Sequence, residues 1–122
     1  MSYKILVVDD EADVRRFLTA VLTKAGFETV TAQDGREALE IVSRENPDLV
    51  ILDLMMPNQT GTDFYRRLTK DDDHSSVPII VVSGLAGRHL AVKKPFAVFD
   101  KPIEPEAFVA AVERALGLGT EP

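Results

Sequence analysis

Near the start of the chain stands the stretch ILVVDD, residues 5–10, in which four apolar residues are followed directly by two carboxylates. Three later apolar runs also end in polar residues. They are Leu49–Leu52 before Asp53, Ile79–Val82 before Ser83, and Phe96–Phe99 before Asp100 and Lys101. Unbroken runs of Ile, Val and Leu are typical of strands in a parallel sheet that is covered by helices on both faces. We therefore expect the polar residues to meet at one edge of a sheet, where open α/β sheets place their sites.

Segments with helical periodicity lie between the apolar runs. Apolar residues recur at helical spacing from Glu11 to Ala25, and Gly26 stands where it can end that helix. Asp34 and Glu37 form the pattern of a capping box, which begins a second helix that must end before Pro47. Two predicted helices therefore lie between the first apolar run, Ile5–Val8, and the second, Leu49–Leu52.

The second half of the chain continues the pattern with one weak place. Thr60 and Asp63 resemble the start of a third helix, and Glu104 is a plausible N-cap for the last helix, with Pro105 at its first position. The segment Gly84–Pro95 should hold the fourth helix, but it contains two glycines and few large apolar residues. We expect this helix to be short or irregular.

With Phe27–Thr31 as a further strand, the pattern is a strand followed by a helix, repeated five times. The right-handed crossover rule converts that pattern into a doubly wound, five-stranded parallel sheet with helices on both faces. We expect one domain over residues 1–118, a short tail over 119–122 and no attached effector domain.

The composition limits the partners and the location. A chain of 122 residues that is 45% hydrophobic has enough material for one core. Its net charge of -6 repels nucleic acid, so we expect no direct nucleic-acid binding. No cysteine is present, which excludes disulfides and thiolate metal sites. No apolar run approaches the roughly 20 residues that span a bilayer, and no signal peptide is recognisable, so we expect no membrane insertion and a cytoplasmic location.

The polar residues at the strand ends form a chemically meaningful set. In a doubly wound order the first and third strands are neighbours, so Asp9, Asp10 and Asp53 would share one pocket. Carboxylates about 4 Å apart repel by roughly 4 kcal/mol at an effective dielectric of 20, and a hard cation such as Mg²⁺ would relieve that repulsion. Asp53 could then act as a nucleophile toward phosphorus, with the Ser83 hydroxyl and the Lys101 ammonium near the phosphoryl oxygens. Taken singly, each residue also has an ordinary structural explanation, such as helix capping or a turn.

These residues together resemble the receiver domain of bacterial two-component response regulators, over about Tyr3–Leu116. The likeness rests on ILVVDDE at residues 5–11, on DLMMP at 53–57 with Gly61 eight residues after the first Asp, on Ser83, and on Lys101-Pro102. It implies a flavodoxin-like fold with strand order 2-1-3-4-5. The length is similar to that of the single-domain members that serve chemotaxis and phosphorelays.

The resemblance also implies roles for the site residues. Asp53 is the implied phosphoacceptor. A sensor histidine kinase or a phosphotransfer protein is the implied donor of the phosphoryl group. Asp9, Asp10, Asp53 and the backbone carbonyl of Met55 are the implied Mg²⁺ ligands. Ser83 is the switch hydroxyl, and Lys101 contacts the phosphoryl group.

Two features depart from the family pattern. Val98 stands where the family has a switch aromatic, and Phe99, one residue later, should face the other side of its strand. Ser83 and Lys101 are only 18 residues apart, which is shorter than usual in the family. Outside the site, we expect His74 to lie in a solvated acidic loop.

The sequence therefore predicts a phosphorylation-activated signalling switch that is read by a downstream partner protein. It would catalyse only its own phosphorylation and dephosphorylation and would not be an enzyme with an external substrate. One alternative is a receiver-like binding module that acts independently of phosphate. The other is a Mg²⁺-dependent phosphohydrolase, which would need an acid/base Asp at position 55, where the chain has Met.

Overall fold

A computed structural model describes residues 3–53, 56, 60–83, 97–100 and 103–118, with the backbone alone at Thr60, Ser83, Val98 and Asp100. The strands are Lys4–Val8 (β1), Glu28–Ala32 (β2), Leu49–Leu52 (β3), Ile79–Ser83 (β4) and Ala97–Asp100 (β5). The helices are Ala12–Lys24 (α1), Gly35–Glu45 (α2), Thr60–Lys70 (α3) and Pro105–Ala115 (α5). The predicted fourth helix falls outside the described residues. In the part of the chain that is described, no helix is both long enough and apolar enough to span a bilayer.

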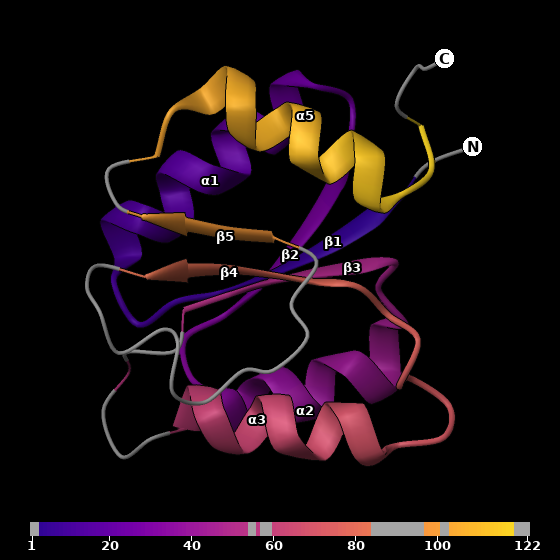
Figure 1. The fold of residues 1–122 in the computed structure, drawn as a ribbon. Helices are drawn as coiled ribbons and strands as arrows, with labels where there is room; N and C mark the ends of the chain where they lie inside the picture. Colours follow the sequence, from indigo (N-terminus) through magenta and orange to yellow (C-terminus); the bar gives the residue numbers. More distant parts are fainter. Residues whose placement is uncertain (1–2, 54–55, 57–59, 84–96, 101–102, 119–122) are drawn as a thin grey trace.

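The strands form one parallel sheet in the order β2-β1-β3-β4-β5 (Figure 1). Strand β1 pairs with both β2 and β3, so that Val8 lies opposite Ala32 on one side and Leu52 on the other. The carboxyl ends of β1 and β3 therefore lie side by side. The predicted α/β class, a parallel sheet covered by helices, is confirmed.

Two hydrophobic clusters lie on opposite faces of the sheet. Helices α1 and α5 cover one face, and helices α2 and α3 cover the other (Figure 1). Alternate residues of β1 enter different clusters: Ile5 and Val7 join Phe108 of α5, whereas Leu6 and Val8 join Phe64 of α3. These four β1 side chains are at most 1% exposed, and burying each one contributes about 1.5–3 kcal/mol.

Two predicted helix starts are present in detail. The Asp34 carboxylate accepts the N–H of Glu37 at 2.8 Å, and the Glu37 carboxylate accepts the N–H of Gln33 at 2.8 Å. This reciprocal pair is the predicted capping box at the start of α2. At the start of α5, the Glu104 carboxylate accepts two N–H groups of the first turn, and Pro105 is the first helical residue.

The loop after α3 is joined to the end of α2 through His74. The residue is only 9% exposed, and its imidazole has Nδ1 at 2.8 Å from an Asp71 carboxylate oxygen and Nε2 at 3.0 Å from the side-chain oxygen of Asn46. Asn46 caps α2 in the left-handed conformation, with φ of 48°. The expectation that His74 is solvated is therefore wrong. Its partner at the end of α2 lies 28 residues away in the sequence, a contact that no local pattern indicates.

Candidate functional site

The backbones of Asp9 and Asp53 are held by hydrogen bonds that continue the sheet beyond its last paired strand residues. The N–H of Asp9 donates to the carbonyl of Ala32 at 3.1 Å, and the N–H of Asp53 donates to the carbonyl of Val8 at 3.0 Å. Each Asp is thus the first residue after a buried strand, and the two strands are neighbours. The sheet register, rather than a flexible loop, positions the two residues.

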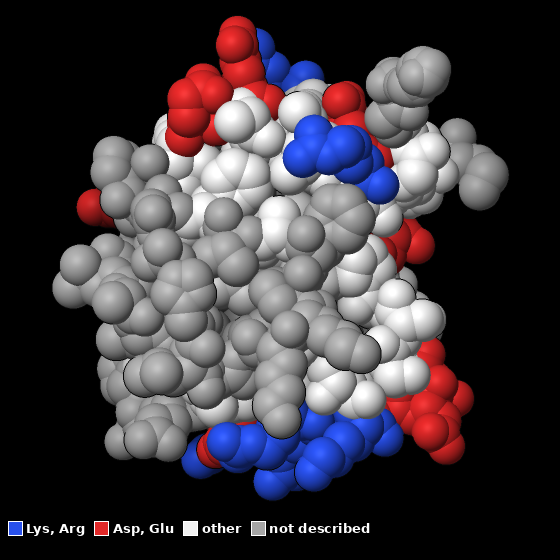
Figure 2. All heavy atoms as spheres, viewed as in Figure 1, with Lys and Arg blue, Asp and Glu red and all other residues white. Residues whose placement is uncertain are grey.

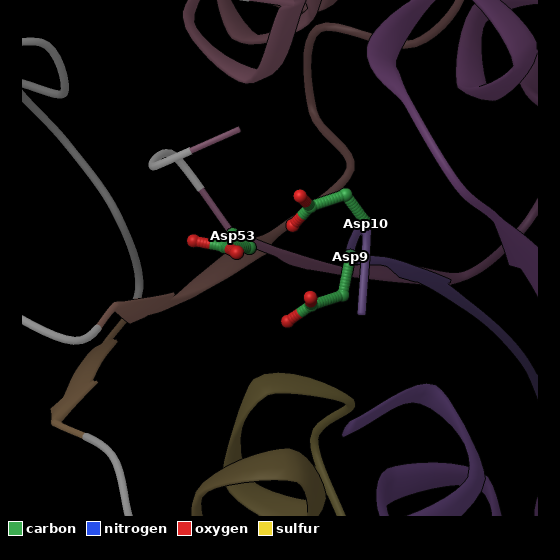
Figure 3. A group of neighbouring side chains, drawn as sticks. All are labelled: Asp9, Asp10 and Asp53. Carbon is green, nitrogen blue, oxygen red and sulfur yellow. The ribbon is translucent and has the colours of Figure 1, made fainter. Parts of the chain in front are cut away.

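The carboxylates of Asp9, Asp10 and Asp53 converge at this edge of the sheet (Figure 3). One oxygen from each carboxylate lies within 4.8 Å of the corresponding oxygens of the other two. Asp9 and Asp53 are 1% and 3% exposed, whereas Asp10 is exposed. The structure therefore places close together the three carboxylates that the sequence predicts to lie at this edge of the sheet.

The electrostatics of this acidic cluster favour a bound cation. Two unit charges 4.8 Å apart repel by about 3.5 kcal/mol at an effective dielectric of 20, and burial withdraws Asp9 and Asp53 from the water that would screen them. A donor set made of carboxylate oxygens, without His or Cys, suits a hard cation of the Mg²⁺ type. The residues present therefore fit the metal that was predicted.

Hydrogen bonds to the first turn of α1 also orient Asp9. One oxygen of its carboxylate accepts the N–H of Glu11 at 2.9 Å. Its backbone carbonyl accepts a hydrogen bond from the Arg15 guanidinium at 2.6 Å. These contacts tie the strand end to the helix that follows it.

Arg15 was not predicted as a residue of the site. It lies in the first turn of α1, where the helix dipole favours acidic rather than basic side chains. That unfavourable placement was the available signal, because a cation there needs a local partner. The partner is the Asp9 carbonyl, so Arg15 brings a positive charge close to the acidic cluster.

The remaining predicted site residues are described in part or not at all. Ser83 is the last residue of β4, and its backbone lies opposite that of Asp100 in β5. Ser83 is therefore at the same end of the sheet as the acidic cluster. Its side chain, together with Met55 and Lys101, is outside the described residues. Phe99 packs with the α1–α5 cluster, and its ring centroid lies 5.7 Å from that of Phe108.

Sequence comparison places the acidic cluster in a known context. The chain is 35% identical over 120 residues to the sporulation initiation phosphotransferase F of Bacillus subtilis, with 97% of each chain covered. It is 34% identical over 116 residues to protein Rrf1 of Nitratidesulfovibrio vulgaris, covering 95% of this chain and 84% of the relative. Probable transcriptional regulators ycf27 are longer; this chain spans about half of them, for example 47% of the one from Porphyra purpurea.

Comparison with solved structures agrees with the sequence relatives. The chemotaxis response regulator CheY4 of Vibrio cholerae superimposes with a TM-score of 0.84 at 30% identity, covering 95% of this chain and 100% of that one. The family model described as "Response regulator receiver domain" matches residues 5–113, which include all three residues of the acidic cluster. The chain belongs to the response regulator receiver domain family.

Proposed function

We propose that this receiver domain is a phosphorylation-activated switch of a two-component system, with Asp53 as the phosphoacceptor. The observation that carries the proposal is the convergence of Asp9, Asp10 and Asp53 at the carboxyl ends of β1 and β3. Receiver domains act as signalling modules, exchange phosphoryl groups with histidine kinases or phosphotransfer proteins, and bind Mg²⁺ at an acidic pocket.

In the proposed reaction a carboxylate oxygen of Asp53 attacks the phosphorus of a phosphohistidine on the partner protein. An O–P bond forms, the N–P bond breaks, and the electron pair of the broken bond stays on the imidazole nitrogen, which then takes up a proton. The role of the protein is mainly to position the reacting groups and neutralise their charge. The backbone hydrogen bond from Asp53 to Val8 supports this role, because it holds the nucleophile at a fixed place beside the other two carboxylates.

The proposed Mg²⁺ ligands are Asp9, Asp10, Asp53 and the backbone carbonyl of Met55. When bound, Mg²⁺ would neutralise charge on the phosphoryl oxygens. The hydrogen bond from the N–H of Glu11 orients the Asp9 carboxylate, while the exposed position of Asp10 leaves its carboxylate accessible from solvent.

Ser83 and Lys101 complete the proposed site. A Ser83 hydroxyl would donate a hydrogen bond to a phosphoryl oxygen, and a Lys101 ammonium would pair with the same group. Phosphorylation adds charge at the sheet edge and would shift an existing equilibrium between two arrangements of the surrounding loops. A downstream partner protein would read that shift.

The proposal includes three narrower points. The protein would catalyse only its own phosphorylation and dephosphorylation, without turnover of an external substrate. The receiver domain would occupy residues 1–118, with residues 119–122 as a tail. The cytoplasmic location stays a prediction from the sequence.

A phosphate-independent binding module is the second candidate. The observation that favours it is the position of Phe99, whose ring packs edge to face on Phe108, while Val98 occupies the family's switch-aromatic position. The Phe99 ring packs in the hydrophobic cluster on the face of the sheet that α1 and α5 cover. It therefore cannot rotate in response to a movement of the Ser83 hydroxyl. Phosphorylation chemistry and partner binding should therefore be measured separately.

The decisive test is incubation of the purified protein with acetyl phosphate, with and without Mg²⁺, followed by intact mass spectrometry. We expect one Mg²⁺-dependent phosphoryl adduct that is absent from Asp53→Ala and retained by Asp72→Asn, a variant of an exposed Asp far along the chain. Absence of an adduct from the wild-type protein, together with failure to bind beryllofluoride, would reject the switch in favour of the binding module. Many turnovers of a small phosphate ester would instead indicate a phosphohydrolase.

A further inference from the structure

The outer surface of helices α2 and α3 carries a basic patch on an otherwise acidic protein. Figure 2 shows Lys and Arg side chains gathered along the side of the molecule that these helices cover in Figure 1. We define the α2–α3 basic patch as the exposed residues Arg36, Arg66, Arg67 and Lys70. Because the whole chain has a net charge of -6, the positive charge on the α2–α3 layer is opposite in sign to that of the protein as a whole.

A pocket of about 230 Å³ lies within this patch, between the N-terminal part of α2 and residues 63–67 of α3. Its lining residues are Gly35, Arg36 and Leu39 of α2 and Asp63, Phe64 and Arg67 of α3. The two guanidinium-bearing residues thus border one pocket from different helices. Leu39, which is partly exposed, supplies apolar surface on which a short aliphatic stem could rest, and the buried Phe64 lies beneath the pocket.

The acidic residue of the pocket has an ion-pair partner, whereas the two arginines that line the pocket have none within the described part of the chain. Asp63 is bound by Arg66, with Nη1 and Oδ1 3.0 Å apart. Among the described residues, neither Arg36 nor Arg67 has an acidic group within ion-pair distance. Arg36, Arg66, Arg67 and Asp63 together carry a net charge of +2. The acidic residue of the pocket is already neutralised, and two cations are left for a ligand.

The geometry favours a single carboxylate as that ligand. Arginine presents a planar array of donors that matches a carboxylate in two parallel hydrogen bonds. Sites for drug-sized ligands and cofactors usually measure about 300–1,000 Å³, so this pocket suits one side chain better than a nucleotide.

The surroundings distinguish between two kinds of acidic macromolecule. Glu37 and Glu40 lie on α2, and the acidic run Asp71–Asp73 follows α3 directly. A duplex with one negative charge per roughly 1.7 Å would meet these residues and be repelled. A protein segment can place one carboxylate in the pocket and uncharged residues around it.

We propose that the pocket between α2 and α3 binds a Glu or Asp side chain of an acidic segment in a partner protein, through Arg36 and Arg67. This interaction lies on the α2–α3 layer and requires neither Mg²⁺ nor phosphorylation of Asp53. It would give the domain a docking contact that is present in both states of the proposed switch. Its test is therefore independent of the proposed function.

The experiment measures the binding of a fluorescein-labelled, C-terminally amidated peptide, with one Glu between Gly and Ser residues, to the unphosphorylated protein by fluorescence anisotropy. Titrations at about 0.01 M ionic strength, where the Debye length is roughly 30 Å, detect the interaction, and those at about 0.15 M test its salt dependence. The double variant Arg36→Gln/Arg67→Gln removes both proposed contacts. The matched control, Lys24→Gln/Arg114→Gln, removes two exposed charges from α1 and α5 on the opposite layer.

We expect saturable binding that the pocket double variant weakens by roughly tenfold, as for the loss of two exposed ion pairs, and that the control changes by less than about twofold. Circular dichroism should show both variants folded, because the substituted side chains are exposed. Equal weakening by both variants would show that peptide binding depends only on the overall charge of the protein, and it would overturn the proposal. So would absence of binding, tighter binding of an oligothymidylate of equal charge, or pocket-dependent dimerisation in sedimentation, which would make a second copy the occupant.

Discussion

Replacing Asp10 by Asn should make the metal-free protein more stable and, at the same time, remove most of its response to Mg²⁺. Asp10 is the suitable member of the acidic cluster because it is exposed and, among the described residues, makes no hydrogen bond or ion pair that the change would break. Asp9 and Asp53 are buried, and both have interaction partners. The substitution therefore tests charge repulsion with little change in packing.

The magnitude follows from the distance between the carboxylates. Asp9 and Asp10 are neighbours in the unfolded chain as well, so the repulsion that folding adds comes chiefly from the pair Asp10 and Asp53. Two charges 4.8 Å apart repel by about 0.9 kcal/mol at the dielectric of water and by about 3.5 kcal/mol at 20. Because one partner is exposed and the other buried, we expect Asp10→Asn to raise the free energy of unfolding by about 1–2 kcal/mol without metal.

Urea unfolding followed by circular dichroism, in EDTA and at increasing Mg²⁺, measures both effects. With m of about 1–3 kcal/mol/M, a gain of 1 kcal/mol moves the midpoint upward by roughly 0.3–1 M. In the wild-type protein, Mg²⁺ at tenfold its Kd should add about 1.4 kcal/mol, and Asp10→Asn should lose most of that increment.

Asp72→Asn is the control, since it makes the same change of charge at an exposed residue away from the cluster. It should alter the free energy of unfolding by less than about 0.5 kcal/mol and keep the Mg²⁺ response. The reasoning is refuted if Asp10→Asn is less stable than the wild type in EDTA, or if Mg²⁺ stabilises the two proteins equally.

Three further changes test the fold by urea unfolding. His74→Ala should lower stability by about 1–3 kcal/mol, since it breaks the contacts that join the loop to α2. The hydrogen bond from His74 holds the pKa of Asp71 below its usual 3.8. The stability that the ionised Asp71 gains from His74 is therefore complete above pH 3.8 and is lost as the pH falls through the lowered pKa. A stability deficit of His74→Ala that does not shrink at low pH would contradict this account. Asp34→Ala should cost about 1 kcal/mol through loss of the cap on the Glu37 N–H, whereas Asp34→Ser should recover most of it. Phe108→Ala should cost about 3–5 kcal/mol, because the ring is fully buried, and a loss below 1 kcal/mol would show that it is not a core residue.

Features that depend on local chemistry were predictable from the sequence. The capping box of Asp34 and Glu37 and the cap by Glu104 need only residues within one helical turn, and both are present. The meeting of Asp53 with Asp9 and Asp10 was also predictable, although Asp53 lies 43 residues after Asp10 in the sequence. Parallel pairing brings the ends of adjacent strands together, so strand order alone determines that contact.

Features that depend on tertiary contacts between specific side chains were not predictable. An acidic loop sequence gives no indication that His74 turns inward to Asn46 at the end of another helix. The pocket between Arg36 and Arg67 depends on how α2 and α3 lie against each other, which hydrophobic periodicity does not specify. Arg15 gave only an indirect signal, an unfavourable charge near a helix start.

The separation of the core into two clusters has a consequence for how this domain can change. Because the sheet stands between them, the side chains of the α1–α5 cluster and those of the α2–α3 cluster belong to separate packing units. Substitutions in different clusters, such as Leu18→Ala in one and Phe64→Ala in the other, should have additive effects on the free energy of unfolding within about 0.5 kcal/mol. Each layer can therefore acquire new surface residues, and with them a new partner, without repacking the layer on the other side of the sheet.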